Sequence, residues 1–88
     1  MDYLLCRNRV ADFDTWKEIF DSQALPQRAA GLTPLNFWRA IDEPNNVFFL
    51  FQVSDLDRAR KFVTSPDAAK VGRAAGVVDA DLYFLEGP

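Results

Sequence analysis

A five-residue stretch that occurs twice constrains the fold of this chain more than any other feature. The residues Arg-Ala-Ala-Gly, followed by an aliphatic side chain, occupy positions 28–32 and again positions 73–77. Each copy is typical of a helix C-terminus, where arginine faces the negative end of the helix dipole and glycine adopts the left-handed conformation that stops the helix. The chain is therefore expected to have two halves of similar design.

Helix signals precede both copies. Asp12 is a good N-cap for a first helix, which we expect to break near Leu25 because Pro26 lacks an amide hydrogen. Ser54 and Asp57 resemble a capping box that opens a second helix. The pair Ser65-Pro66 is expected to restart that helix, since proline is tolerated at a first helical position.

Strands are predicted on either side of these helices, at residues 3–10, 35–41, 47–53 and about 81–85. The turn signal at residues 42–46 joins the second and third strands into an antiparallel hairpin. The order is therefore βαββαβ within one domain, residues 1–88. Right-handed crossovers turn that order into a ferredoxin-like α+β fold, a four-stranded antiparallel sheet with helices on one face.

Composition excludes several classes of function. A formal charge of −3 argues against a nucleic-acid partner. The chain has no histidine, which excludes Ser-His and Cys-His nucleophile systems, histidine zinc sites and proximal-histidine haem ligation. The single cysteine, Cys6, cannot form an internal disulfide and is expected to be a small buried hydrophobe. The longest apolar run, residues 47–51, is too short to span a membrane, and no signal peptide is visible, so we expect a cytoplasmic protein.

The third and fourth strands are apolar on both faces. Phe49 and Phe51 point one way while Phe48 and Leu50 point the other. Because the helices cover only one face, the other would be a large apolar patch, which monomers rarely expose. The chain is therefore expected to form a homodimer that packs sheet face against sheet face.

The sequence resembles the dimeric α/β-barrel superfamily, and within it the small proteins grouped with antibiotic-biosynthesis monooxygenases. The resemblance is carried by residues 7–17, 42–46 and 55–60, and by residues 75–77 leading to 83–85. It implies a pocket between sheet and helices that holds a flat, apolar substrate. Similar sequences often have histidine where this chain has Asn8, and haem-degrading relatives need a histidine ligand. Haem is therefore not expected. The sequence also has no Gly-rich phosphate loop, no cysteine pair and no carboxylate cluster with ligand spacing, so neither a metal nor another cofactor is expected.

Five polar or aromatic residues in the strands are candidates for a site. Asn8 shares a face with Leu4 and Cys6, so it is either a core amide with satisfied hydrogen bonds or a group that binds a ligand. The other candidates are two further binding residues, Asn36 and Trp38, and two catalytic ones, Arg39 as an anion stabiliser and Tyr83 as a proton or hydrogen-bond donor. Trp38 and Tyr83 would equally suit a dimer interface.

The predicted function is to bind or oxidise a small aromatic or polyketide-like molecule without metal or haem. An isomerase or cyclase that acts through an enolate is an alternative. A dimer that binds a ligand without catalysis, or has a purely structural role, is another.

Overall fold

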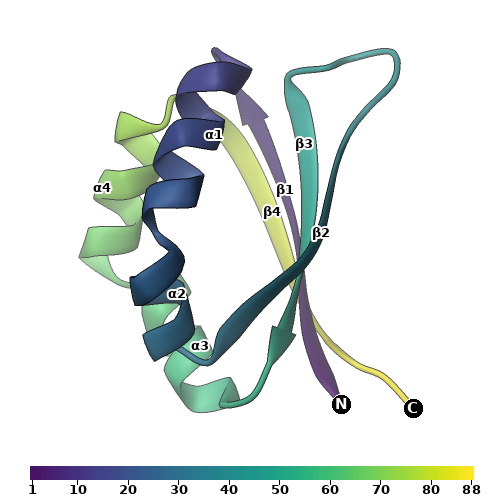
Figure 1. Ribbon diagram of the computed structural model, residues 1–88, viewed down its shortest axis with the longest axis vertical. Coiled ribbons are helices and arrows are strands. Elements are labelled where there is room, and N and C mark those ends of the chain that lie inside the picture. Colours follow the sequence, from purple (N-terminus) through teal and green to yellow (C-terminus); the bar gives the residue numbers. More distant parts are fainter.

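Two strand–helix–strand halves form the structure, a computed structural model that describes residues 1–88. The elements, in chain order, are β1 (Asp2–Val10), α1 (Phe13–Ser22), α2 (Ala24–Ala29), β2 (Leu32–Arg39), β3 (Asn46–Val53), α3 (Leu56–Val63), α4 (Pro66–Ala74) and β4 (Val77–Glu86). The strands form one antiparallel sheet in the order β2-β3-β1-β4. All four helices lie on one side of this sheet and the other side is bare (Figure 1). The predicted ferredoxin-like fold is confirmed.

The first helical segment breaks earlier than predicted. Asp12 caps α1 as expected, since its carboxylate accepts a hydrogen bond from the Thr15 amide at 2.9 Å. The helix ends at Ser22, and Gln23 rather than Leu25 separates it from α2. Pro26 lies in the first turn of α2, where amide hydrogens have no partner within a helix, so its missing amide hydrogen removes no bond.

The cap of α3 is Asp55, and the prediction of Ser54 is wrong. The Asp55 carboxylate accepts from the Arg58 amide at 3.1 Å, whereas the Ser54 hydroxyl donates to the carbonyl oxygen of Gly31 at 3.3 Å. Ser54 therefore makes a tertiary contact with Gly31 instead of capping the helix. Ser65 caps α4 and Pro66 occupies its first position, as predicted.

Both repeated stretches end a helix and start a strand. Gly31 and Gly76 have φ values of 78° and 77°, the left-handed conformation that glycine adopts without strain. The chain passes directly from each glycine into the sheet, so β2 begins at Leu32 and β4 at Val77, both earlier than predicted. Only the C-cap alanine and the glycine therefore separate α2 from β2, and α4 from β4.

The sheet separates the side chains into a helix face and an outer face. Burial alternates along β3, with Phe49 and Phe51 buried under the helices and Phe48 and Leu50 half-buried on the outer face. The main core is built from the helix face together with residues of the helices, Trp16 foremost. None of the four helices could span a membrane, and the longest, α1, has 10 residues.

A β-bulge in β2 decides which face its side chains occupy. The register against β3 shifts between Pro34 and Asn36, so that Leu35 has no partner across the strands. Beyond the bulge, Phe37 lies opposite Phe49 on the helix face. Asn36 and Trp38 lie on the outer face, opposite Leu50 and Phe48. Without the bulge these side chains would exchange faces.

Candidate functional site

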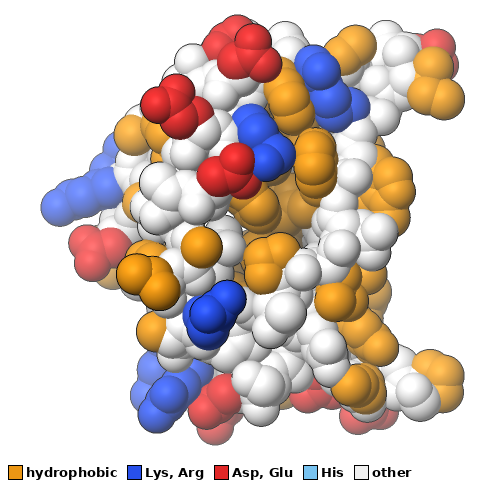
Figure 2. All heavy atoms as spheres, in the orientation of Figure 1, with side chains coloured by type: hydrophobic (Ala, Val, Ile, Leu, Met, Phe, Trp, Pro, Cys, Tyr) orange, Lys and Arg blue, Asp and Glu red, His pale blue; other side chains and the backbone are white.

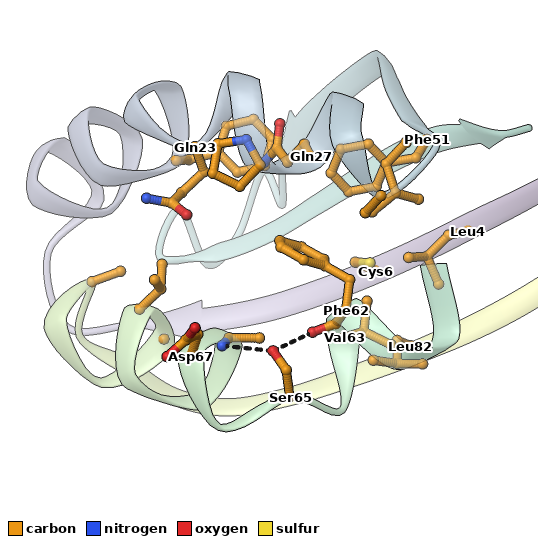
Figure 3. Close-up of a pocket in the computed structure, with 18 of the residues that line it drawn as sticks. Leu4, Cys6, Gln23, Gln27, Phe51, Phe62, Val63, Ser65, Asp67 and Leu82 are labelled. Carbon is orange, nitrogen blue, oxygen red and sulfur yellow. Dashed lines mark hydrogen bonds between the residues drawn. The ribbon is translucent and has the colours of Figure 1, made fainter. Parts of the chain in front are cut away.

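A cavity of about 770 Å³ lies between the helix face of the sheet and the helices. Its floor is formed by side chains of β1 and β3, and its walls come from all four helices (Figure 3). Most of the lining is apolar, including Leu4, Cys6, Trp16, Phe20, Phe49, Phe51, Phe62 and Leu82. Small-molecule sites typically have this size and this apolar character, with a few polar groups that orient the ligand.

The floor of the cavity follows β1 from Leu4 to Asn8. Four residues of strand at roughly 3.3 Å each give the floor a length of about 13 Å. Aromatic rings stand along the same wall, with Trp16 and Phe20 4.9 Å apart between ring centres and Phe49 in contact with both. The cavity therefore extends along β1 beside a wall of aromatic rings, an arrangement that suits a flat ring system.

Asn8 is the polar side chain of this floor. In the amide orientation that satisfies its neighbours, the Asn8 side-chain oxygen accepts from the indole Nε1 of Trp16 at 3.1 Å. The amide nitrogen donates one hydrogen to the backbone oxygen of Arg7 at 3.0 Å. A primary amide has two N–H hydrogens, so the second remains free. Trp16, a residue of the buried core, thus also holds Asn8 in place.

Two glutamines that the sequence analysis missed also line the cavity. Gln23, the residue between α1 and α2, and Gln27 of α2 lie across the cavity from Asp67 of α4 (Figure 3). Gln27 is the one buried polar side chain of the protein, 6% exposed. Their positions continue the helical spacing of the apolar stripe through Trp16 and Phe20. A polar residue on an apolar stripe was the signal that could have found them.

The rim of the cavity carries charged side chains. Arg58 and Lys61 of α3 and Asp67 at the start of α4 line it and are exposed. Ser65 is committed to the helices, since its hydroxyl donates to the Phe62 carbonyl at 2.7 Å and accepts from the Ala68 amide at 3.1 Å (Figure 3). The polar groups left for a ligand are therefore the amides inside the cavity and the charges at its mouth.

Cys6 lies on the cavity floor as a neutral thiol. Burial in apolar surroundings raises the pKa of the Cys6 thiol from 9.0 to about 12. The thiolate, which is the nucleophilic form, is therefore scarce at neutral pH. No group of three or more His, Cys, Asp or Glu side chains gathers as a metal site would require.

The structure brings only one of the five predicted site residues to the cavity floor, Asn8. Trp38 and Tyr83 are exposed on the outer face of the sheet. Asn36 of β2 borders a smaller groove between α1 and β2, of about 450 Å³, where the space-filling view shows apolar side chains (Figure 2). Arg39 lies at the sheet edge with its guanidinium carbon 3.8 Å from the ring centre of Phe13, and its Nε donates to the Pro44 carbonyl at 2.9 Å.

The outer face has an ionic end and an apolar centre. Arg7 forms ion pairs with Asp79 and, at 2.8 Å, with Asp81, while Arg9 pairs with Asp79 at 3.0 Å. Hydrogen bonds from the two arginines lower the pKa of Asp79, and those to the two aspartates raise the pKa of Arg7. Next to this network the sheet register places Leu5 beside Leu50.

No family model matches the sequence, and no curated protein matches it either. Solved structures do match over nearly the whole chain. The cofactor-independent oxygenase SnoaB of Streptomyces nogalater superposes with a TM-score of 0.74 at 16% identity, covering 98% of this chain and 91% of its own. A candidate antibiotic biosynthesis monooxygenase of Bordetella bronchiseptica gives 0.77 at 11% identity, covering 99% and 96%.

This chain has the antibiotic-biosynthesis-monooxygenase-like fold. An uncharacterized NIPSNAP domain protein of Burkholderia xenovorans also shares this monooxygenase-like fold, with a TM-score of 0.68 at 12% identity over 100% of this chain and 95% of its own. The resemblance read from the sequence is thus confirmed for the fold. Identities this low say nothing of the chemistry, which has to be argued from the cavity.

Proposed function

We propose that this chain binds a small, flat, apolar molecule of aromatic or polyketide-like type in the cavity beneath its helices. The observation that carries the proposal is a cavity of about 770 Å³ with an aromatic wall and an amide held at its floor by an indole donor. Apolar burial supplies the affinity, and the polar groups orient the ligand.

Asn8 is proposed as the orienting group. Trp16 occupies its side-chain oxygen and the Arg7 carbonyl takes one amide hydrogen. The remaining N–H is a donor on a floor that is otherwise apolar, so a carbonyl or phenol oxygen of the ligand would accept from it. The structure favours a ligand-binding Asn8 whose oxygen is fixed by the core, which combines the two alternatives left open by the sequence.

The protein is proposed to work as a homodimer through the outer face of the sheet. Trp38, Tyr83 and Leu85 are 49%, 57% and 44% exposed there, around the half-buried Leu5 and Leu50. An apolar face of this kind is more stable when a second copy covers it. Trp38 and Tyr83 then belong to the interface. The predicted site residues that lie away from the cavity floor could take part in ligand chemistry only through contact across the dimer; they are Asn36, Trp38, Arg39 and Tyr83.

Cofactor-free oxygenation of an electron-rich phenol is the reaction we propose for a bound ligand. The phenol supplies the electrons: O₂ contributes one oxygen atom to the ring to give a quinone, and its second oxygen leaves as water. The likeness in fold to an oxygenase described as cofactor-independent supports this choice. Isomerisation or cyclisation through an enolate is the alternative, because an amide N–H stabilises an enolate oxygen equally well.

Fluorescence titration with N-phenyl-1-naphthylamine, an apolar naphthalene dye, tests the binding proposal. We expect saturable binding with one dye per chain and displacement of the dye by 1-naphthol. An absence of saturable binding would overturn the proposal. An oxygen electrode then separates enzyme from binding module, since oxygenation consumes one O₂ for each quinone formed from 1-naphthol, whereas a binding module consumes none.

A further inference from the structure

Gln27 is a polar group in a place that favours an apolar one. Gln27 is 6% exposed, it lines the cavity together with Phe20 of α1, and its amide has no hydrogen-bond partner within the chain. No fully enclosed side-chain nitrogen or oxygen lacks a partner, so the amide of Gln27 must reach open space. That space belongs to the cavity and to the groove beside β2, since Gln27 and Phe20 line both.

An apolar side chain would stabilise the empty protein more than this glutamine does. Burial of most of an amide is unfavourable, because few of its hydrogen bonds to water remain and no protein group replaces the others. Methionine has nearly the same length and helix propensity as glutamine and carries no such cost. Folding alone therefore gives no reason for an amide at this position, whereas binding does.

We propose that the amide of Gln27 hydrogen-bonds an oxygen atom of the bound molecule and so selects an oxygenated ring system over a hydrocarbon. This inference rests on the proposed function and specifies its ligand. A primary amide both donates and accepts, so Gln27 can pair with a hydroxyl or a carbonyl group. Asn8 can only donate to a ligand, because its oxygen is held by Trp16. Gln27 therefore adds to the cavity an acceptor for a ligand hydroxyl group, which Asn8 cannot supply.

The test compares Gln27→Met with Gln52→Met, a matched change on the outer face of the sheet, where Gln52 lies opposite Tyr3 and outside the cavity. Each variant is titrated with N-phenyl-1-naphthylamine and, by competition, with 1-naphthol and naphthalene. For Gln27→Met we expect affinity for 1-naphthol to fall about ten-fold. Affinity for naphthalene and the dye should stay within about two-fold, and Gln52→Met should change none of them.

Thermal unfolding of the empty proteins gives the second readout. Gln27→Met should melt at the same temperature as the wild type or higher, since it removes an unpaired amide. A lower melting temperature would show that Gln27 stabilises the fold and would overturn the inference, as would an unchanged affinity for 1-naphthol or an equal loss for all three ligands. In each of those cases, saturable dye binding by the wild type would still support the proposed function. Failure of the wild type to bind any of them overturns both.

Discussion

The indole Nε1 of Trp16 lies 3.1 Å from the side-chain oxygen of Asn8, and this bond joins the helix α1 to the floor of the cavity. Trp16 is 2% exposed, so its indole nitrogen has little contact with water and the Asn8 oxygen is its partner. The contact makes one residue serve the core and the site together. It also determines that Asn8 presents an N–H, and not an oxygen, to a ligand.

Removal of the indole donor should therefore destabilise the protein. Trp16→Phe keeps an aromatic ring in the core but leaves the Asn8 oxygen without its partner, and we expect a loss of about 1–3 kcal/mol in the free energy of unfolding. Urea denaturation measures it. Leu25→Ala, at a position of α2 that is 76% exposed and lies away from the outer face, is the control and should cost less than about 0.5 kcal/mol. Equal losses in both variants would contradict the proposed bond.

Gly72 offers a way to fill the cavity without disturbing the core. It lines the cavity within α4, and a Cβ built there meets nothing within 4 Å. Gly72→Ala should stabilise the helix by up to about 1 kcal/mol and leave dye binding nearly intact. Gly72→Leu should fold equally well but weaken dye binding at least ten-fold, measured by fluorescence titration. Retention of full affinity by the leucine variant would place the dye elsewhere.

The proposed dimer depends on the apolar centre of the outer face. Leu50→Glu places a charge there while Val47, Phe49 and the rest of the helix face of β3 keep their positions. A buried unpaired charge is costly, so we expect the wild type to elute at twice its 10.0 kDa chain mass and the variant at the chain mass, by size exclusion with light scattering. Circular dichroism should show a folded variant. A wild type that elutes as a monomer would contradict the proposed homodimer.

The ionic end of the outer face should contribute a dependence of stability on pH. Hydrogen bonds from Arg7 and Arg9 lower the pKa of Asp79 below its ordinary value of 3.8. A carboxylate with a depressed pKa in the folded state stabilises the protein above its unfolded pKa, and this contribution is lost as the pH falls through the folded value. The difference in unfolding free energy between wild type and Asp79→Asn should therefore be constant at pH 5–7 and shrink below pH 3.8. A difference that grows in acid would refute the assignment.

Cys6 should be protected chemically as long as the protein is folded. With its pKa raised to about 12, the thiol is neutral at pH 8 and buried on the cavity floor. We expect Ellman's reagent to react slowly with the native protein and at once in urea. Since the unfolded thiol ionises near 9.0 and the folded one does not, stability should also decline as the pH rises above 9. Rapid labelling of the native protein would show that reagents reach the cavity freely.

Local signals in the sequence predicted most of the fold. The glycines of the repeated stretch stop their helices in the left-handed conformation, as expected, because only glycine adopts it without strain. Asp12 and Ser65 cap helices for the same kind of local reason. Ser54 failed as a cap because Gly31, distant in sequence, provides it with a different partner.

The candidate site was less predictable, because its residues come from all parts of the chain. Asn8 was identified because it is a polar residue that strand alternation places with Leu4 and Cys6. Gln27 was missed although it lies on the extended apolar stripe of the first helical segment. Its significance depends on the lack of a hydrogen-bond partner for its side-chain amide, which only the packed structure reveals.

The sequence by itself determined the order of the elements, the ends of the helices and the alternation of side chains along each strand, since these depend on residues close together in the chain. It determined that Asn36 and Trp38 share one face of β2, but not which face. The bulge at Leu35 decided that, because pairing with β3 skips one residue there and reverses every side chain beyond it. Register is a property of two strands together, and so tertiary structure alone placed Trp38 outside and Phe37 under the helices.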